Sequence, residues 1–499
     1  MELSTVLSLV LVLLGFLWWK TWRPKSFPPG PLAFPLVGNL LQMDFSGPLQ
    51  GMKKLSEVYG PVYSMYLGSQ PTVIVRGFKA LKEILVVKGT EFADRPQNRL
   101  TRTVSHLKGL VVAPYGKTWK EHRRFTLSTL RNFGLGRKSM EEKIAEESAY
   151  LIQDFKKNKD TLFDPHCVIN NAVSNIICSI VFGRRYDYDD STFQDILHLV
   201  NENMKMTMGI WGQLYNAFGF IHYLPLPHQK ILKNIDTVYG FLQRIVEEHK
   251  KTRTPGEPRD YIDCYLEELD KSALQGEEDN NNKKTFDNQN LSTCVADLFI
   301  AGTETTSATM EWSLLYMMAF PEVQEKCRKE IDKIRGDRTR LDYEDRVSMP
   351  YTQAVLQEVH RMASIVPLGI PHTNLNEVQL NGYTIPKGTV IITDLSSLNY
   401  DETYWKYPHE FNPENFLTED GELRKVEPFL PFSAGPRVCL GENLARMETF
   451  LFFTGLLTHF EFHWPDPASP PDLTPVYALS QTPKHFKMRL VPRINDKPS

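Results

Sequence analysis

The stretch PFSAGPRVCLGE, residues 431–442, places one cysteine, Cys439, among two glycines, two prolines and an arginine. Gly435 and Gly441 allow backbone conformations and close approaches that a side chain would block. An amphipathic helix is predicted for residues 440–460, and the free N–H groups and dipole at its start would stabilise an anionic sulfur. The loop alone is compatible with a metal-binding thiolate and equally with a buried structural cysteine in a tight turn.

The composition is that of a large globular protein. The chain has 499 residues, 41% hydrophobic and 23% charged, and its net charge of −3 is unlike the basic excess of a nucleic-acid-binding protein. The cysteines form no C-x-x-C pair, which argues against a disulfide framework, a zinc site or an iron–sulfur cluster and favours a reducing compartment. They are Cys167, Cys178, Cys264, Cys294, Cys327 and Cys439.

The N-terminus predicts a retained membrane anchor. Residues 3–19 are apolar apart from three hydroxyl residues, and the cations follow this run instead of preceding it, which is the reverse of a cleaved signal peptide. A span needs about 17–20 apolar residues, and the cations after it favour a cytosolic position for the rest of the chain. We therefore expect an anchor at 1–20, a basic, proline-rich hinge at 21–35, for which a generic linker is the alternative, and one large domain at 36–499.

Helical periodicity dominates the main domain, whereas strand-like runs are few and short. The helical segments are 119–133, 141–157, 236–251, 321–334 and 351–362. The strand-like segments are 61–67, 71–77, 389–395 and 486–492. The fold class expected is mostly α with minor β sheets.

The segment FIAGTETTSATMEW, residues 299–312, lies in a long apolar helix that a proline stops. Ala301, Gly302 and Thr305 share one face, where small residues would let a flat ligand lie against the helix and would favour a local opening. Ala-Gly-Thr alone fits an ordinary core helix as well. The acid–alcohol pair Glu304–Thr305 is harder to explain as core.

Two further pairs are spaced like neighbours on a helix. Glu358 and Arg361 are three residues apart in QEVHRM, and Trp119 and Arg123 are one turn apart in GKTWKEHRRF. By themselves these pairs are weak signals, because E-x-x-R abounds on solvated helices and a tryptophan often anchors an amphipathic surface helix.

Together, Phe432, Gly435, Arg437, Cys439 and Gly441 read F-x-x-G-x-R-x-C-x-G. This pattern resembles the heme-binding loop of the cytochrome P450 family, in which the cysteine thiolate is the axial iron ligand. The resemblance implies that Cys439 ligates the heme iron and that Phe432, Gly435 and Arg437 bind the heme. The fold it implies is a single large heme-thiolate domain.

The residues from Ala301 to Thr305 resemble the A-G-x-E/D-T motif of the same family. In that family the acid–alcohol pair manages the protons delivered to bound dioxygen. The resemblance therefore implies that Thr305 is the oxygen-activating alcohol and Glu304 its acidic neighbour.

The remaining motifs match the family in order. Glu358 and Arg361 resemble a buried core pair that locks the cysteine-bearing segment, but Asn415 stands where the family pattern has arginine. That departure puts any third-member role of residue 415 in doubt. Trp119 and Arg123 resemble the W-x-x-x-R contact to the heme propionates.

Three further residues are implied as propionate partners by the same matching. They are His372 in GIPHT, Arg437 in the cysteine loop and, with a less certain alignment, Arg95 in FADRP.

The resemblance covers essentially the whole chain and is greatest to the animal microsomal branch called family 2. It implies heme b and a monooxygenase that inserts one oxygen atom from O₂ into an apolar xenobiotic, fatty acid or steroid. Electrons would come from NADPH through a flavoprotein reductase, with cytochrome b5 as a further partner. The location implied is the endoplasmic reticulum membrane, with a single-pass anchor and the catalytic domain facing the cytosol.

Two rival functions remain open. A heme-thiolate isomerase, dehydratase or peroxygenase would need no reductase, and the Glu304–Thr305 pair argues against it. A non-enzymatic heme or gas sensor would show a regulatory domain, and no shift in composition indicates one.

Substrate and reductase surfaces are also expected. The four segments 98–114, 204–220, 364–370 and 478–482 are rich in apolar residues and would contact an apolar substrate, although core packing or membrane contact explains 204–220 equally. A cationic surface beside the predicted propionate helix would dock an acidic reductase, with a solvated basic helix as the alternative. Its residues are Lys117, Lys120, Arg124, Arg131, Arg137 and Lys138.

Overall fold

The computed structural model describes most of the chain. The described residues are Val12, Gly15, 23–44, 47–133, 138–159, 161–274, 285–466 and 468–493. Among these residues, no helix combines the length and the apolar character that a bilayer crossing requires. Apart from Val12 and Gly15, the predicted anchor at 1–20 lies outside the described residues. The predicted hinge packs on the domain, because Arg23 donates to Ser64 Oγ at 2.9 Å and Ser64 Oγ donates to Pro28 O at 2.7 Å.

Helices make up most of the domain. In chain order they are η1 (Leu40–Gln42), α2 (Pro48–Tyr59), α3 (Phe78–Lys82), η2 (Glu83–Val87), α4 (Arg99–Ser105), α5 (Lys117–Asn132), α6 (Lys138–Lys157), α7 (His166–Val181), α8 (Ser191–Met208), α9 (Ile210–Ala217), η3 (Gly219–Tyr223), α10 (His228–Thr252), α11 (Tyr261–Leu274), α12 (Asn288–Ala319), α13 (Pro321–Arg335), η4 (Tyr343–Ser348), α14 (Pro350–Ala363), α15 (Ser396–Asn399), η5 (Pro413–Phe416), η6 (Gly435–Arg437) and α16 (Glu442–His459). The five segments with predicted helical periodicity fall in α5, α6, α10, α13 and α14, which confirms them.

Among the described residues, three small sheets contain the strands. They are β1 (Val62–Leu67), β2 (Gln70–Val75), β3 (His372–Thr373), β4 (Val378–Leu380), β5 (Tyr383–Ile385), β6 (Val390–Thr393), β7 (Phe460–His463) and β8 (Arg489–Pro492). The largest sheet has the order β1-β2-β6-β3, with β2 and β6 parallel and the other pairs antiparallel. β4 pairs with β5 and β7 with β8, both antiparallel. The four strand-like segments are confirmed, and the fold class is mostly α with minor β.

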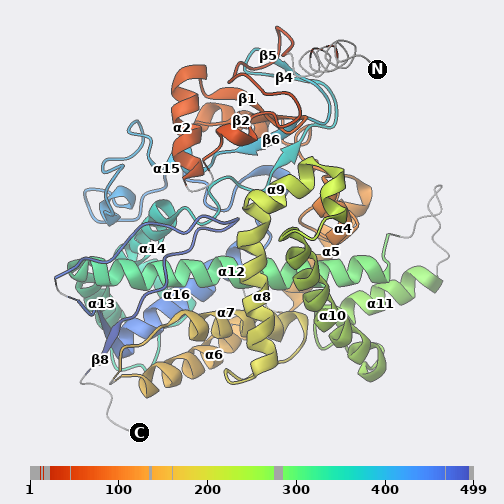
Figure 1. The fold of residues 1–499 in the computed structure, drawn as a ribbon. Coiled ribbons are helices and arrows are strands. Elements are labelled where there is room, and N and C mark those ends of the chain that lie inside the picture. The colour runs from red at the N-terminus through yellow and green to blue at the C-terminus, as the bar shows by residue number, and fades with distance from the viewer. Residues whose placement is uncertain are drawn as a thin grey trace.

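The helix α12 crosses the whole molecule, with the β1-β2-β6 sheet and α2 on one side and α6, α7 and α16 on the other (Figure 1). It has 32 residues, so it spans about 48 Å at 1.5 Å per residue. The Asp287 side chain caps it by accepting from Asn290 N at 2.8 Å, and Pro321 begins the next helix directly after Phe320. The sequence-predicted long helix is therefore one continuous element.

The helix α7 packs along α12 and is buried on nearly all sides. Ile169, Val173, Ile176 and Ile180 belong to the main hydrophobic core together with residues of α12 and α16. A helix without a polar face shows no contrast between buried and exposed positions, which is why periodicity did not predict α7.

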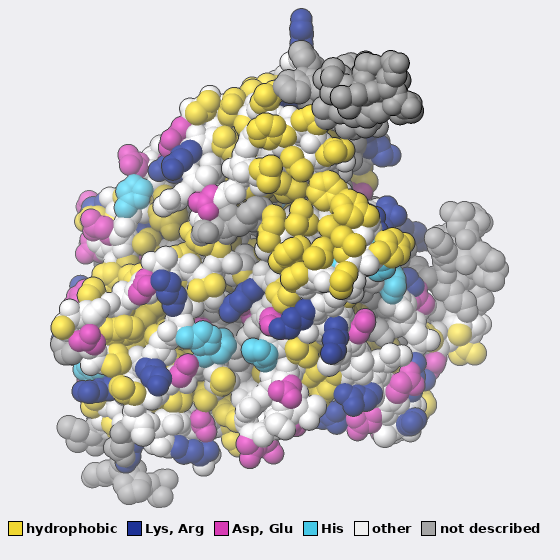
Figure 2. Space-filling model, in the orientation of Figure 1, with side chains coloured by type: hydrophobic (Ala, Val, Ile, Leu, Met, Phe, Trp, Pro, Cys, Tyr) yellow, Lys and Arg dark blue, Asp and Glu magenta, His cyan; other side chains and the backbone are white. Residues whose placement is uncertain are grey.

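Figure 2 shows hydrophobic side chains gathered over the region where α9 lies in Figure 1. Exposed apolar side chains in and after α9 include Ile210, Phe220, Tyr223 and Leu224. Part of the aromatic and methionine-rich run at 204–220 therefore lies at the surface, so core packing does not account for all of it.

Candidate functional site

Cys439 lies in the short turn between η6 and the start of α16. Cys439 N donates to Phe432 O at 3.0 Å, which closes the loop on itself. Gly435 has φ +75, and a Cβ there would lie 1.7 Å from Leu85 O. Only glycine fits this position, because a side chain would meet both backbone strain and the η2 backbone.

The two loop glycines have different reasons for being there. Gly441 has φ −93, and a Cβ at this position would meet no described heavy atom within 4 Å. The expectation that a side chain would be blocked is therefore confirmed for Gly435, whereas at Gly441 the polypeptide itself leaves room for one.

Gly435→Ala is expected to destabilise the protein, because the residue would have to leave its left-handed conformation and push η2 away. A strained backbone position costs about 1–3 kcal/mol, and the overlap with Leu85 O adds to this. The measurement is the urea midpoint of the purified protein. Gly441→Ala is the matched control, and a midpoint shift as large as that of Gly435→Ala would contradict this account of the loop.

Cys439 is an accessible thiol, whereas Cys178, Cys294 and Cys327 are buried. The surrounding protein still removes enough water that burial raises the pKa of the Cys439 thiol, while the N–H groups of Gly441 and Glu442 point at the sulfur and act in the opposite direction. The N–H groups favour the thiolate, and a metal cation bound to the sulfur would complete its deprotonation. An accessible sulfur held in front of two N–H donors suits a metal ligand better than a buried structural cysteine.

Three guanidinium groups converge beside this loop. The nitrogens of Arg437 donate to the backbone oxygens of Ala93, Leu110 and Ala113 at 2.8, 3.2 and 2.6 Å, and its Cζ lies 3.9 Å from the centre of the Trp119 ring. Arg123 Nη2 donates to Val438 O at 2.5 Å, next to Cys439.

Arg95, the third member, is buried and ties the 98–114 region to the strand that carries His372. Its Nε donates to Val111 O at 3.0 Å, and its Nη1 donates to Ile370 O at 2.7 Å and Pro371 O at 3.0 Å. Trp119 Nε1 donates to Leu110 O at 2.9 Å. The residues that the resemblance implied as one group are therefore brought together.

The electrostatics of this cluster favour an anion. Burial lowers the pKa of Arg437 to about 10, and it lowers the pKa of Arg95 well below its usual value, with repulsion from Arg437 and Arg123 adding to the effect. The negative charge of Asp94 partly opposes these shifts, because it raises the pKa of both Arg437 and Arg95. Two further carboxylates, such as the propionates of heme, would relieve the repulsion, so the residues present fit this group.

His372 lies on the edge of the cluster and is buried. Its Nδ1 donates to Phe92 O at 2.7 Å, and burial together with Arg95 and Arg437 lowers its pKa well below that of a free histidine. Its Nε2 can donate to a carboxylate only when the ring is an imidazolium. A propionate would favour that form by adding a negative charge.

Phe432 packs between the cysteine loop and two helices, α14 and α16. Its ring makes an edge contact with His360 of α14 at 5.4 Å between centroids, and Arg446 Cζ lies 4.8 Å from the ring centre. The side chain thus joins α14 and α16 to the loop that presents Cys439.

The residues from Ala301 to Thr305 lie in a continuous part of α12, without the local opening that the sequence suggested. Thr305 Oγ1 donates to Ala301 O at 2.8 Å within this helix, and Ala301 is exposed while Gly302 and Thr305 are half-buried. A Cβ on Gly302 would lie 2.4 Å from Ile177 Cδ1. Gly302 therefore makes room for α7, and the expectation that it provides space for a flat ligand is wrong. Ala301 and Thr305 remain on the accessible face.

Glu304 is buried and points toward the C-terminal segment. Ser480 Oγ donates to Glu304 Oε1 at 3.0 Å. Burial raises the pKa of this carboxyl, the Ser480 hydrogen bond opposes the shift, and the charge of Glu311 adds to it. Glu304 and Thr305 are consecutive on α12 but point in different directions. Thr305 lies on the accessible face of the helix, whereas the Glu304 carboxyl points toward Ser480.

Glu358 and Arg361 form a fully buried, bidentate ion pair. Arg361 Nε and Nη2 donate to the Glu358 carboxylate at 2.8 and 2.6 Å. The remaining Arg361 hydrogen bonds go to four backbone oxygens of the segment that precedes the cysteine loop, those of Asn399, Tyr407, Pro408 and Glu410. The buried core pair implied by the sequence is present.

Asn415 is a third member of this network. Its Nδ2 donates to Glu358 Oε1 at 3.1 Å and to Tyr407 O at 3.0 Å, and its Oδ1 accepts from Tyr407 N at 2.9 Å. The doubt over residue 415 is resolved: an amide takes the place of the family's guanidinium.

Asp297 is a site residue that the sequence did not reveal. This half-buried residue of α12 accepts from Leu110 N at 2.6 Å and Val111 N at 3.0 Å, and loss of water around the carboxyl raises its pKa to about 6. It fixes the 98–114 segment over α12. Only the long-range contact identifies it, because an aspartate in an apolar helix has no local signature.

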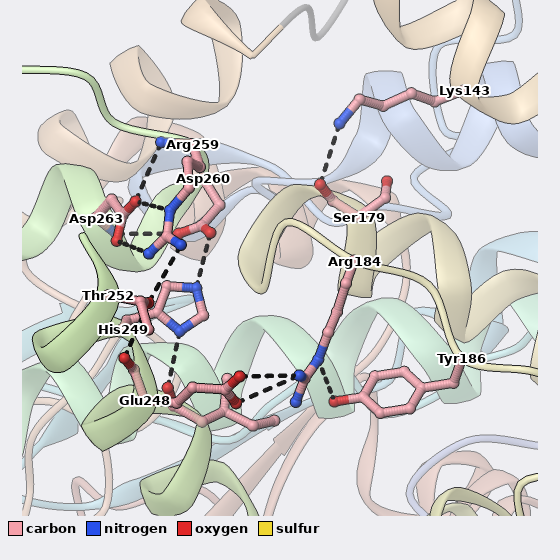
Figure 3. Close-up of polar contacts among 11 residues, drawn as sticks. Lys143, Ser179, Arg184, Tyr186, Glu248, His249, Thr252, Arg259, Asp260 and Asp263 are labelled. Atoms are coloured by element: carbon pink, nitrogen blue, oxygen red, sulfur yellow. Dashed lines mark hydrogen bonds and ion pairs between the residues drawn. The ribbon is translucent and has the colours of Figure 1, made fainter. Parts of the chain in front are cut away.

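A second polar cluster lies between α10 and α11. His249, Asp260 and Asp263 could in principle hold a metal ion, but their atoms already have partners (Figure 3). The His249 ring binds Ile245 O at 2.7 Å and Asp260 at 2.8 Å, and Arg259 Nε and Nη2 bind Asp263 at 2.6 and 3.0 Å. The cluster is an ion-pair network that joins two helices.

Comparison with known proteins adds family information to this geometry. The family model for Cytochrome P450 matches residues 28–490. Mouse cytochrome P450 2J5 is 43% identical over 92% of this chain and 91% of its own length, and human cytochrome P450 2J2 is 43% identical over 93% and 91%. Rat cytochrome P450 2C23 is 39% identical over 98% of both chains.

Proposed function

Because this chain belongs to the cytochrome P450 family, we propose that it oxygenates an apolar xenobiotic, fatty acid or steroid with electrons from NADPH. The chain is a heme-dependent monooxygenase. The substrate class, delivery of electrons by a flavoprotein reductase, a contribution of cytochrome b5 and a location at the endoplasmic reticulum membrane belong to the proposal.

One observation carries the proposal most strongly: the accessible Cys439 thiol lies beside a cluster of buried guanidinium groups that favours carboxylates. Cys439 would ligate the iron, and Arg123, Arg437, Trp119 and His372 would hold the propionate side. The heme, when bound, supplies the binding and reductive activation of O₂.

The protein's own part in the reaction is to position substrate and to supply protons. Thr305 offers a hydroxyl on the accessible face of α12, and Glu304 offers a carboxyl whose raised pKa keeps it protonated to higher pH than a free glutamate. Substrate would lie against Ala301 and Thr305.

Two of the four expected substrate segments, 98–114 and 478–482, bond directly to this part of α12. Asp297 holds 98–114, and Ser480 in 478–482 binds Glu304. Ile365 O in 364–370 accepts from Gln481 N at 2.7 Å, and Lys205 in 204–220 interacts electrostatically with Glu304. Their apolar side chains favour an apolar substrate.

Reductase docking is assigned to the cationic face of α5. Lys117, Lys120, Glu121 and Arg124 line a surface groove, and α5 also carries Trp119 and Arg123. Arg131 and Lys138 are exposed nearby, whereas Arg137 lies outside the described residues. The same helix thus has one face toward the proposed heme and one toward a partner.

Lys120→Glu is expected to raise the KM for an acidic reductase about tenfold at low ionic strength, with kcat at saturating reductase little changed, because steering depends on charge complementarity. The measurement is NADPH-dependent turnover against reductase concentration at two salt concentrations. Lys251→Glu on α10 is the matched control. Equal effects of the two reversals would contradict docking at α5.

Reductase dependence also separates the rival functions. An isomerase, a peroxygenase or a sensor would show no reductase-dependent NADPH consumption coupled to product. A screen of fatty acids, steroids and xenobiotics with reductase, NADPH and O₂ tests the substrate class, and product without reductase would overturn the proposal.

A further inference from the structure

A line of polar side chains runs along one face of α12 away from Glu304. Ser307 and Glu311 follow Glu304 at spacings of three and four residues, so the three residues lie above one another within two helical turns. All three are buried. Buried polar groups in such a row need an explanation, because each costs free energy unless it is paired.

The middle of the row is a hydroxyl without a protein partner. Ser307 Oγ makes no hydrogen bond to any residue that the structure describes, although the residue is only 2% exposed. A buried hydroxyl between two carboxyl groups has polar neighbours on both sides, which is the setting that holds ordered water.

The outer end of the row reaches the surface through α7. His166 Nδ1 lies 2.8 Å from Glu311 Oε1, and the His485 ring makes an edge contact with the His166 ring at 4.4 Å between centroids. The His485 side chain is 60% exposed and lies 3.7 Å from Asp164, whereas that of His166 is 24% exposed and that of Glu311 only 6%. Exposure therefore increases steadily from α12 to solvent.

We propose that Ser307, Glu311 and His166 form the proton-input route that reprotonates Glu304 during turnover, with His485 and Asp164 at its solvent end. This inference rests on the proposed function, because it assigns a proton source to the acid beside Thr305. The three residues act through Glu304 and touch no substrate.

Each transfer along the route moves one proton and no electrons. The His166 imidazolium breaks its Nδ1–H bond as a Glu311 O–H bond forms, which leaves the neutral ring with its remaining proton on Nε2. Glu311 then releases its proton through water and the Ser307 hydroxyl, which passes on its own proton as it accepts the incoming one. Glu304 ends protonated, and rotation of the neutral His166 ring turns its unprotonated nitrogen outward, where a solvent proton restores the imidazolium.

The charges around the two ends agree with this direction. Glu304 is faced by Ser480, by Glu311 on its own helix, by His166 from α7 and by Lys205 from α8. Burial disfavours the His166 imidazolium, but the hydrogen bond and charge of Glu311, with Asp164 and Glu304, outweigh it and raise its pKa. His166 thus keeps its proton to higher pH than a free histidine and loses it as the pH rises through that raised value.

Two substitutions separate a route from a purely electrostatic pair. Glu311→Gln removes a negative neighbour and is expected to lower the pKa of Glu304, whereas His166→Gln removes a positive neighbour and is expected to raise it. If both residues belong to one route, each variant should nevertheless slow proton delivery to Glu304 about tenfold. This factor is smaller than the roughly 100- to 10,000-fold contribution of general acid catalysis as a whole.

The experiment uses the full-length holoenzyme. Infrared titration of the protonated carboxyl band, with Glu304→Gln to identify it, reports the pKa of Glu304 without turnover. Product formed per NADPH, peroxide released and the solvent isotope effect then report proton delivery. We expect opposite pKa shifts but lower coupling and a larger isotope effect in both variants, with recovery in Glu311→Asp. His463→Gln, whose ring pairs with Glu461 at 3.1 Å, is the control.

Coupling that changes in opposite directions in the two variants would overturn the route and leave only an electrostatic pair. Unchanged coupling in both would overturn it as well. Failure of the proposed function is distinguishable, because the wild-type protein would then show no reductase-dependent oxygenation, whatever the Glu304 titration shows. Thermal unfolding of each variant shows whether it is folded. If Glu311→Gln or His166→Gln does not fold, the coupling of Glu311→Asp is compared with that of Ser307→Ala, and the route predicts lower coupling only in Ser307→Ala.

Discussion

Cys439→Ser is expected to abolish oxygenation while the polypeptide fold is retained. The loop is shaped by the Cys439 N–H bond to Phe432 O and by Gly435, and neither depends on the sulfur. In the heme-free polypeptide Cys439 is accessible, so the change from SH to OH should alter the free energy of unfolding of the apoprotein by about 0.5 kcal/mol or less. The serine hydroxyl is too weak an acid to replace a thiolate ligand, so activity should fall to background.

Activity with reductase, heme content and the urea midpoint are the measurements for this variant. Cys327→Ser is the control: Cys327 is buried, and burial raises the pKa of its thiol, so it is expected to lower stability and to retain activity per heme. Oxygenation by Cys439→Ser at the wild-type rate would contradict the assignment of the ligand.

Arg361→Ala should destabilise the protein more than any other single substitution considered. It would leave the Glu358 carboxylate buried without its cation and would release four backbone oxygens from their donor. Breaking a buried pair from one side costs about 3–5 kcal/mol. Since the freed segment leads into the cysteine loop, heme retention should fall together with the urea midpoint.

A solvated ion pair provides the comparison. Lys329 and Glu325 lie one turn apart on α13 at 3.5 Å, with side chains 75% and 47% exposed. Lys329→Ala is expected to cost less than about 1 kcal/mol. Similar losses in the two variants would mean that the Glu358–Arg361 pair contributes no more than an ordinary surface pair.

Much of the candidate site could be predicted from short sequence motifs. The spacing around Cys439, the E-x-x-R pair and the W-x-x-x-R pair each predicted residues that the structure places together, because helix geometry and tight turns relate neighbours in sequence to neighbours in space. The long amphipathic helices were predicted for the same reason. The roles of these residues toward heme remain part of the proposal.

Contacts between distant segments could not be predicted in this way. Gly302 was expected to face a ligand, but only the position of Ile177 shows that it accommodates α7. Asn415 replaces a guanidinium, and only the geometry of Tyr407 and Glu358 shows that an amide suffices there.

The polar groups on α12 illustrate the same limit. Asp297 binds the backbone of Leu110 and Val111, and Glu311 pairs with His166, which is 145 residues away in sequence. Neither acid belongs to a local pattern, so their partners are set by how α12 packs and not by neighbouring residues in the chain.

The carbon monoxide difference spectrum of the reduced wild-type protein tests the central claim most directly. If Cys439 binds heme iron as a thiolate, the Soret band of the complex will be strongly red-shifted, and the shifted band will persist in Cys327→Ser. A Soret band at the unshifted position that a neutral axial ligand gives, in freshly prepared and folded protein, would contradict the account.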